Sequence, residues 1–251
     1  MRRFEGKRVI VTGGGKGIGK ATVARFAAEG ASVVLTGRDR GAAELAAREI
    51  ADETGAAVYP FVADVSVKAD DEATIQFALD KMQGIDVLVN NAGIYYEEPF
   101  EEISEEHWDQ IMDIDLKGTF LMCQAVLPHF KEKKAGIIVN MSSTNGLAGE
   151  IGYAHYNAAK GGVVLLTKTL AIEFGPDNIR VNCVCPGYIL TESTEAMDSD
   201  EFVADYIQNK IPLRRTGESE EVASVIAFLA SDDASFVHGE SILIDGGQLA
   251  D

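Results

Sequence analysis

The sequence is poor in positive charge. Lys and Arg number 22 against 40 Asp and Glu, which gives a formal net charge of −18 at pH 7. Nucleic-acid backbones and anionic lipid surfaces recruit proteins through concentrated Lys and Arg. The charge balance therefore argues against a nucleic-acid or membrane-surface partner, and it raises the question of how so acidic a chain would hold an anionic ligand.

Cysteine and long apolar runs are also scarce. The three cysteines, Cys123, Cys183 and Cys185, are an odd number, and no CxxC or paired-His motif completes a metal site. No apolar run approaches the ~18 residues that span a bilayer. The two arginines after Met1 are not followed by the apolar stretch of a signal peptide. We expect buried reduced thiols, no metal and no membrane span, in a cytoplasmic protein.

Apolar runs of strand length alternate with helical patterns along all 251 residues, without a linker or repeat. We expect strands at residues 8–12, 32–36, 57–62, 85–90, 137–141, 180–185 and 241–244. We expect helices at 17–29, 39–53, 70–83, 104–130, 153–174, 200–209 and 219–230. Near-continuous apolar strands between helices indicate a parallel sheet covered on both faces. The prediction is one α/β domain over residues 1–251, a Rossmann-type doubly wound sheet of seven parallel strands.

A glycine-rich turn joins the first predicted strand to the first helix. It reads Thr12-Gly13-Gly14-Gly15-Lys16-Gly17-Ile18-Gly19, which fits TGxxxGxG rather than GxGxxG. A bound pyrophosphate needs close approach of the backbone and helix N–H groups that point at it. A tight strand-to-helix turn would also explain the glycines. Their position in the first βαβ unit favours a dinucleotide site.

Four further motifs follow predicted strand ends. They are Asn90-Asn91-Ala92-Gly93, Ser143 with Tyr156-x-x-x-Lys160 beginning 13 residues later, Pro186-Gly187, and Asp245-Gly246-Gly247. With the glycine turn, and in this order, they resemble the short-chain dehydrogenases/reductases over essentially the whole chain. The resemblance is to 3-oxoacyl-carrier-protein reductases and to sugar or polyol dehydrogenases. It implies an NAD(P)-dependent enzyme acting on CH–OH and C=O groups, assembled as a homotetramer.

Tyr156 and Lys160 occupy positions i and i+4 of a predicted helix, so their side chains share a face. A phenol has a pKa of about 10, and a neighbouring ammonium favours the phenolate and lowers that pKa. A pKa of ~7 would require about 4 kcal/mol, and a positive nicotinamide ring would add to what the ammonium supplies. On spacing alone, the alternative is an aromatic side chain and a cation on a solvated helix face.

The family resemblance implies a role for each of these residues. Tyr156 would exchange a proton with the substrate oxygen, and Lys160 would tune Tyr156 and hold the nicotinamide ribose. Ser143 would hydrogen-bond and orient the carbonyl, whereas Ser142 would face the other way and be structural. Hydride transfer itself is the chemistry of the cofactor.

One position departs from the family pattern. Related sequences carry Asn in the long helix, where it supports a proton-relay water, but this chain has Asp115, 28 residues before Ser143. An ionised aspartate accepts hydrogen bonds but cannot donate them. It could also pair with Lys160 and weaken the effect of the cation on Tyr156. We therefore assign Asp115 to the catalytic set, with a higher pH optimum or slower turnover as its expected effect.

Cofactor choice depends on the end of the second predicted strand. NAD enzymes usually place an acid there, whereas a nearby Arg accommodates the 2′-phosphate of NADP. Here Gly37 takes the acid position and Arg38 follows, with Lys16 as a second cation and Asp39 as a competing charge. NADP(H) is favoured, and NAD(H) stays possible. The resemblance assigns cofactor contacts to Thr12, Gly13, Lys16, Gly17, Ile18, Gly19, Arg38, Asp64, Val65, Asn91, Gly93, Tyr156, Lys160, Ile189 and Thr191.

The family builds its substrate lid in the segment that corresponds to residues 188–211. Its first part is polar, and Met197, Phe202 and Tyr206 could close over a ligand. Expected pocket neighbours are Tyr95, Tyr96, Glu150, Ile151, His155 and Tyr188, of which His155 is expected to serve packing rather than catalysis. The mixture predicts a small polar substrate of sugar, polyol or oxoacyl type.

Two alternatives to a dehydrogenase stay open. A relative could use the same site for dehydration or epimerisation with recycling of the cofactor. A non-catalytic dinucleotide sensor would have lost the chemistry, and Asp115 is the feature in its favour. The acidic residues between Glu97 and Glu106 could form a cation site, although a solvated helix start is the simpler interpretation.

Overall fold

The computed structural model describes residues 2–197 and 199–250, apart from the side chains of Ser193 and Met197. Seven strands form one parallel sheet in the order β3-β2-β1-β4-β5-β6-β9. They are β1 (Arg8–Val11), β2 (Ser32–Gly37), β3 (Val58–Val62), β4 (Val87–Asn90), β5 (Gly136–Met141), β6 (Ile179–Pro186) and β9 (Ser241–Ile244). The predicted doubly wound, seven-stranded α/β domain is confirmed.

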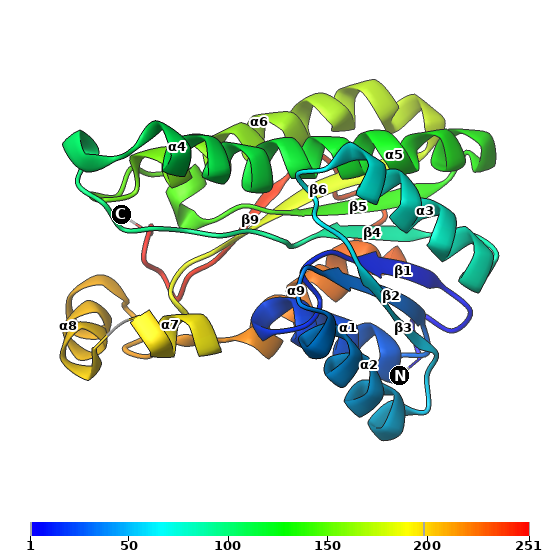
Figure 1. Ribbon diagram of the computed structural model, residues 1–251, viewed down its shortest axis with the longest axis horizontal. Helices are drawn as coiled ribbons and strands as arrows, with labels where there is room; N and C mark the ends of the chain where they lie inside the picture. The colour runs from blue at the N-terminus through cyan, green and yellow to red at the C-terminus, as the bar shows by residue number, and fades with distance from the viewer. Residues whose placement is uncertain (1, 198, 251) are drawn as a thin grey trace.

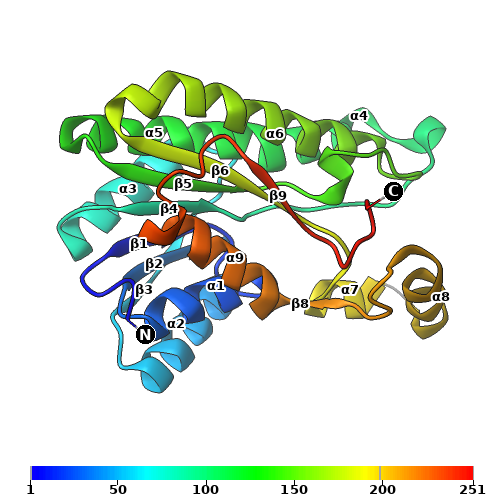
Figure 2. The same ribbon diagram turned by 180° about the vertical axis from the view of Figure 1, so that it is seen from behind.

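Helices cover both faces of the sheet (Figures 1 and 2). One face carries α1 (Gly17–Ala28), α2 (Arg40–Thr54) and α9 (Ser219–Ala230), and the other carries α3 (Lys68–Met82), α5 (Gly118–Lys133) and α6 (Ala154–Phe174). Successive strand side chains point to opposite faces. In β1, Val9 and Val11 therefore pack in one core cluster and Ile10 packs in the other. This two-sided burial is why the strands are continuously apolar.

The helix expected at 104–130 is interrupted. It consists of α4 (Glu105–Ile111), a π-helical turn (Met112–Lys117) and then α5. The Ser104 hydroxyl caps α4 by accepting a hydrogen bond from the His107 N–H at 3.0 Å. A π-helical turn within a helix often marks a functional site, and this turn contains Asp115.

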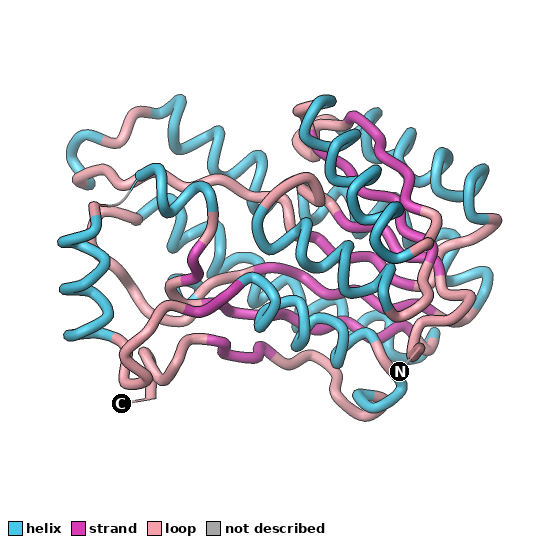
Figure 3. The backbone as a smooth tube through the Cα atoms, turned by 90° about the horizontal axis from the view of Figure 1, so that it is seen from below, coloured by secondary structure: helices cyan, strands magenta, loops and turns pink. Residues whose placement is uncertain are grey.

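The predicted lid has more structure than the sequence indicates. It contains α7 (Glu192–Met197) and α8 (Asp200–Lys210), and β7 (Ile189–Leu190) pairs with β8 (Gly217–Glu218). Segments this short carry no measurable periodicity, so α7 and the β7–β8 pair escaped the sequence analysis. The helices of the lid stand at one end of the molecule, near the last described residues (Figure 3). The Met197 side chain, expected to help close the lid, and Asp198 fall outside what is described.

Candidate active site

A cavity of about 1160 Å³ lies between the carboxyl ends of the strands and the lid. It brings together nine of the predicted site residues: Ile18, Asn91, Gly93, Asp115, Ser143, Tyr156, Lys160, Ile189 and Thr191. The other predicted cofactor residues, Thr12, Gly13, Lys16, Gly17, Gly19, Arg38, Asp64 and Val65, lie outside its lining. The chemistry-bearing residues thus meet at the strand ends, where ligands bind in open α/β sheets.

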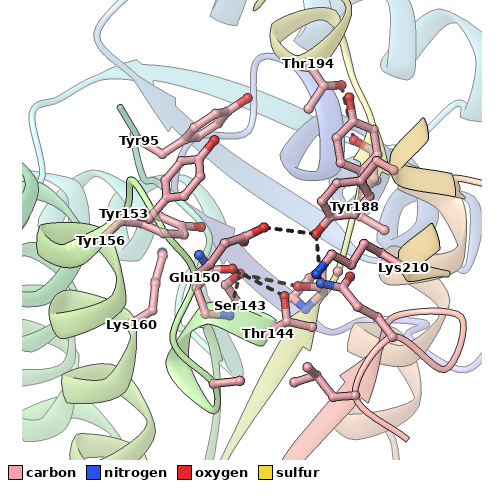
Figure 4. A pocket seen from close by; sticks show the side chains of 18 of the residues that line it. Tyr95, Ser143, Thr144, Glu150, Tyr153, Tyr156, Lys160, Tyr188, Thr194 and Lys210 are labelled. Carbon is pink, nitrogen blue, oxygen red and sulfur yellow. Dashed lines mark hydrogen bonds between the residues drawn. The ribbon is translucent and has the colours of Figure 1, made fainter. Parts of the chain in front are cut away.

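Helix α6 carries Tyr156 and Lys160 one turn apart, and both face the cavity (Figure 4). The Lys160 Nζ lies 5.4 Å from the centre of the Tyr156 ring. It donates a hydrogen bond to the Met141 carbonyl at 3.1 Å, and the residue is only 2% exposed. A buried ammonium is costly without an opposite charge beside it, so Lys160 requires an acidic partner.

That partner is Asp115. Its Oδ2 lies 2.8 Å from the Lys160 Nζ, and its Oδ1 accepts a hydrogen bond from the Ile94 N–H at 2.9 Å. A Cβ on Gly93 would stand 2.8 Å from the Asp115 Oδ2, so this position has no room for a side chain. The pairing between Asp115 and Lys160 anticipated from the sequence is confirmed.

The ion pair changes the electrostatics of Tyr156. Burial raises the pKa of the Tyr156 phenol, the Lys160 charge lowers it and the Asp115 charge raises it, so the pKa ends above its ordinary value. Burial lowers the pKa of the Lys160 ammonium, but Asp115 more than offsets this, and that pKa is raised as well. Burial also raises the pKa of the Asp115 carboxyl, against the opposing effects of Lys160 and the Ile94 N–H. The protein groups alone therefore do not lower the pKa of Tyr156 toward neutral pH.

Two serines follow β5 and have different surroundings. The Ser143 Oγ accepts a hydrogen bond from the Asn145 N–H at 3.2 Å and lies 3.5 Å from the Pro186 carbonyl oxygen. The Ser142 Oγ donates to the Lys160 carbonyl at 2.9 Å, within α6. Ser142 thus ties β5 to the helix of Tyr156, as its expected structural role requires.

His155 does more than the packing expected of it. It is fully buried, and its Nδ1 accepts a hydrogen bond from the Tyr156 N–H at 2.9 Å. Its Nε2 lies 3.3 Å from a Glu98 Oε2, and the other oxygen of Glu98 contacts the His107 Nδ1 at 2.8 Å. The first N–H groups of a helix lack partners inside it, and Tyr153 at the N-cap of α6 makes no side-chain cap. His155 therefore caps the helix that carries Tyr156.

The glycine turn has the form of a cradle for a phosphate. Gly13 has φ +65°, and a Cβ on it would stand 2.9 Å from the Ala92 Cα; a Cβ on Gly19 would stand 2.1 Å from the Gly13 carbonyl oxygen. Lys16 at the N-cap of α1 makes no side-chain cap, so its side chain does not compete with an anion for the first N–H groups of this helix. The donor set and the close backbone approach fit a pyrophosphate.

Thr12 links the glycine turn to the segment that follows β4. Its hydroxyl accepts hydrogen bonds from the N–H groups of Asn91 and Ala92 at 3.0 and 3.1 Å. The Asn91 side chain donates in return to the Thr12 carbonyl at 2.9 Å. The ends of β1 and β4 are thus locked together beside the cavity.

The end of β2 leaves Arg38 exposed. The neighbouring Asp39 is occupied as the cap of α2, because its Oδ1 accepts the Ala42 N–H at 3.1 Å. A Cβ on Gly37 would meet nothing within 4 Å, which leaves open space beside the guanidinium. Burial tends to raise the pKa of Asp64, but hydrogen bonds from Ser66 and the charge of Arg38 lower it overall.

Comparison with known proteins assigns the family. A family model described as Enoyl-(Acyl carrier protein) reductase matches residues 13–248. The chain belongs to the short-chain dehydrogenase/reductase family. Relatives of this short-chain dehydrogenase/reductase include the meso-2,3-butanediol dehydrogenase of Serratia marcescens, 41% identical over 99% of this chain and 96% of that protein. A 3-oxoacyl-(acyl-carrier-protein) reductase of Thermotoga maritima is 42% identical over 98% of each chain.

Solved structures agree with this assignment. The crystal structure of levodione reductase superposes with a TM-score of 0.95, at 38% identity and with 99% of each chain covered. As its relatives are dehydrogenases and reductases, this short-chain dehydrogenase/reductase is an enzyme that acts on CH–OH and C=O groups.

Within residues 2–197 and 199–250, no helix is long and apolar enough to cross a membrane, and no three metal-ligating side chains gather.

The residues that line the cavity of this short-chain dehydrogenase/reductase were only partly foreseen. Tyr95, Glu150, Ile151, Tyr188, Phe202 and Tyr206 line the cavity as expected, whereas Tyr96 and His155 do not. Tyr96 instead packs against the His107 ring, 5.0 Å away, and donates to the Gln110 side chain at 2.9 Å. Gln248 lines the cavity but was missed. Its position directly after Gly246-Gly247 was the available signal.

Proposed function

We propose that this enzyme transfers a hydride between NADP(H) and a small carbonyl or secondary alcohol of sugar, polyol or oxoacyl type. The observation that carries the proposal is the single cavity in which Ser143, Tyr156 and the buried Lys160 meet beside the glycine turn. A phenol, a hydroxyl and an ammonium at one site suit proton exchange with a substrate oxygen. The relatives named as dehydrogenases and reductases support the same chemistry.

The residues divide the work as follows. The nicotinamide supplies or accepts the hydride when bound. Tyr156 gives its proton to the carbonyl oxygen in reduction and takes it back in oxidation, and Ser143 orients that oxygen by hydrogen bonding. Lys160 would hold the nicotinamide ribose and favours the phenolate of Tyr156. Asp115 keeps the buried ammonium of Lys160 in place, 2.8 Å away, at the cost of part of that effect.

Preference for NADP(H) over NAD(H) follows from the end of β2. Arg38 is exposed beside open space at Gly37, and Asp39 is engaged in capping α2. Lys16, also exposed, adds a second cation at the start of α1. A guanidinium pairs well with phosphate oxygens, and Gly37 stands at the position where NAD enzymes usually carry the acid for the ribose 2′-OH.

Assembly and location are part of the proposal. The outer sides of α5 and α6 expose Phe120 (42%), Leu165 (66%) and Ile172 (80%). Apolar side chains exposed along two neighbouring helices suit pairing with a second copy, which supports a homo-oligomer, with a tetramer as the expected form. The three cysteines are buried and unbridged, which supports the reducing cytoplasm.

A substrate panel tests the proposed function. Sugars, polyols, secondary alcohols and oxoacyl esters would be followed by the absorbance of reduced nicotinamide, with each cofactor in turn. Tyr156→Phe should lose about 10²-fold or more of the turnover while it still binds the dinucleotide. Dinucleotide binding without turnover of any compound would favour a sensor. A product without net redox change would favour dehydration or epimerisation.

A further inference from the structure

One carboxylate that lines the cavity has no role in the proposed proton and hydride transfer. Glu150 is half-buried and lines the cavity beside Tyr156 (Figure 4). Its backbone carbonyl accepts a hydrogen bond from the Asn157 side chain at 2.9 Å, which anchors the loop to α6. Its Oε1 accepts the Tyr206 hydroxyl at 3.2 Å. The loop and the lid together hold this carboxylate in the cavity.

The lid side of this contact is also fixed. The Tyr206 hydroxyl accepts a hydrogen bond from the Gln248 side chain at 2.8 Å. The Tyr206 ring packs against Tyr188 and Phe202, with centroids 5.2 and 5.7 Å away. Burial, together with the Glu150 charge, raises the pKa of Tyr206. Tyr206 therefore stays a neutral phenol that donates its hydrogen bond to Glu150.

Glu150 lines the same cavity as Ser143 and Tyr156. Its charge is one of the causes that raise the pKa of Tyr156. A carboxylate has about four lone-pair sites and, when ionised, can only accept hydrogen bonds. The Tyr206 hydroxyl occupies one of them. The Glu150 carboxylate therefore stabilises a ligand in this cavity that donates a hydrogen bond to it, and it repels a ligand group that is an acceptor or an anion.

We propose that Glu150 selects substrates with a hydroxyl group on the carbon next to the reacting carbonyl or alcohol, namely neutral vicinal diols and α-hydroxy carbonyl compounds. The selection rests on the proposed function, because it acts at the same site. The second hydroxyl donates to the carboxylate. In a 3-oxoacyl ester the second oxygen is a carbonyl acceptor, and in a 2-oxo acid it is an anion, so both are disfavoured.

The other charges around the cavity agree with a neutral substrate. Apart from the buried pair of Lys160 with Asp115, the lining carries the carboxylates of Glu97 and Asp205 and the cations Lys210 and Arg214. The two cations are exposed. With Glu150, carboxylates outnumber these cations three to two. Outside the buried pair, the charge on the cavity lining is therefore negative on balance.

Matched substrates test the selection. Butane-2,3-diol would be compared with butan-2-ol in oxidation, and acetoin with butanone and an ester of 3-oxobutanoic acid in reduction. Glu150→Ala should lower the ratio of kcat/KM for the diol to that for butan-2-ol, and the ratio for acetoin to that for butanone, by about tenfold or more. Glu150→Gln, which adds a donor, should raise kcat/KM for the ester. Glu102→Gln removes an exposed carboxylate that does not line the cavity and should leave every value unchanged.

Dinucleotide Kd, measured by nicotinamide fluorescence, separates folding from selection in every variant. Equal losses on the diol and on butan-2-ol in Glu150→Ala, with the Kd kept, would overturn the selection while leaving the proposed function standing. So would a wild-type enzyme that prefers the 3-oxo ester to acetoin. Absence of turnover on the entire set, with either cofactor, would overturn the proposed function and the selection with it.

Discussion

Lys160 and Asp115 form a buried ion pair in the wall of the cavity, with the Nζ 2.8 Å from the Oδ2 and both side chains almost fully excluded from water. Two elements far apart in the sequence meet there, since Lys160 comes from α6 and Asp115 from the π-helical turn before α5. Asp115 compensates the charge of the Lys160 ammonium, which would be costly to bury without a partner. It also places a negative charge where it opposes ionisation of Tyr156.

Asp115→Asn should move the pH dependence of oxidation. The Asp115 charge helps to raise the pKa of Tyr156, so its removal lowers that pKa. Oxidation requires Tyr156 as the base, and kcat/KM should therefore reach its plateau at a lower pH than in the wild type. Asp113→Asn is the matched control, because Asp113 is paired on the surface with Lys117. The same pH profile in wild type and Asp115→Asn would contradict this account.

Arg38→Asp should change the cofactor preference. The substitution removes the guanidinium expected to bind the 2′-phosphate and introduces an acceptor for the ribose 2′-OH. The ratio of kcat/KM with NADPH to that with NADH should fall by about tenfold or more, as expected when one charge-assisted hydrogen bond is lost. Arg40→Asp, two residues further on and paired with Glu44 on α2, is the control. Equal use of both cofactors by the wild type would refute the preference.

His155 offers a paired test of the cap on α6. His155→Asn keeps an acceptor near the position of Nδ1 for the Tyr156 N–H, whereas His155→Gln keeps a donor near Nε2 for Glu98. A lost helix cap costs about 1 kcal/mol. We expect His155→Gln to lower kcat roughly fivefold with unchanged dinucleotide Kd, and His155→Asn to stay closer to the wild type. If both variants lose kcat equally, the hydrogen bond to Tyr156 does not position the catalytic residue.

Asp71 predicts a pH dependence of stability. It is 1% exposed on α3, and within the described residues neither of its carboxyl oxygens has a hydrogen-bond partner. Burial, with the charges of Asp70 and Asp64, raises its pKa to about 8. The folded state therefore keeps a proton that the unfolded chain releases near pH 4. Stability should fall as pH rises from about 4 to about 8, by at most about 1.4 kcal/mol per pH unit.

Asp71→Asn removes this proton uptake. Thermal unfolding at pH 5 and pH 8 should show a smaller drop in Tm across that interval for Asp71→Asn than for the wild type. Asp80→Asn, an exposed position on the same helix, should keep the wild-type drop. A drop of the same size in Asp71→Asn would mean that the buried carboxyl does not control it.

Local patterns in the sequence were enough for the architecture. The apolar runs of β1, β2 and β4 and the helical periods between them predicted a parallel sheet covered on both faces. A strand that is buried on both faces has apolar residues at every position instead of alternating polar and apolar ones. Spacing was also enough for the closeness of Tyr156 and Lys160, because i and i+4 share a helix face. Motifs directly after strand ends indicated where the site would be, since parallel strands end at one edge.

Contacts between distant segments were decided only by the tertiary structure. The π-helical turn that turns Asp115 toward Lys160, the capping of Tyr156 by His155 and the contact of Tyr206 with Glu150 and Gln248 leave no periodic signal. Each depends on the distance between side chains that strand crossovers bring together. Composition shows a chain of net charge −18, but which carboxylates face the cavity is set by packing. Short-range periodicity in the sequence determines the helices and strands, whereas the electrostatics of the site depend on packing between segments that are distant in the sequence.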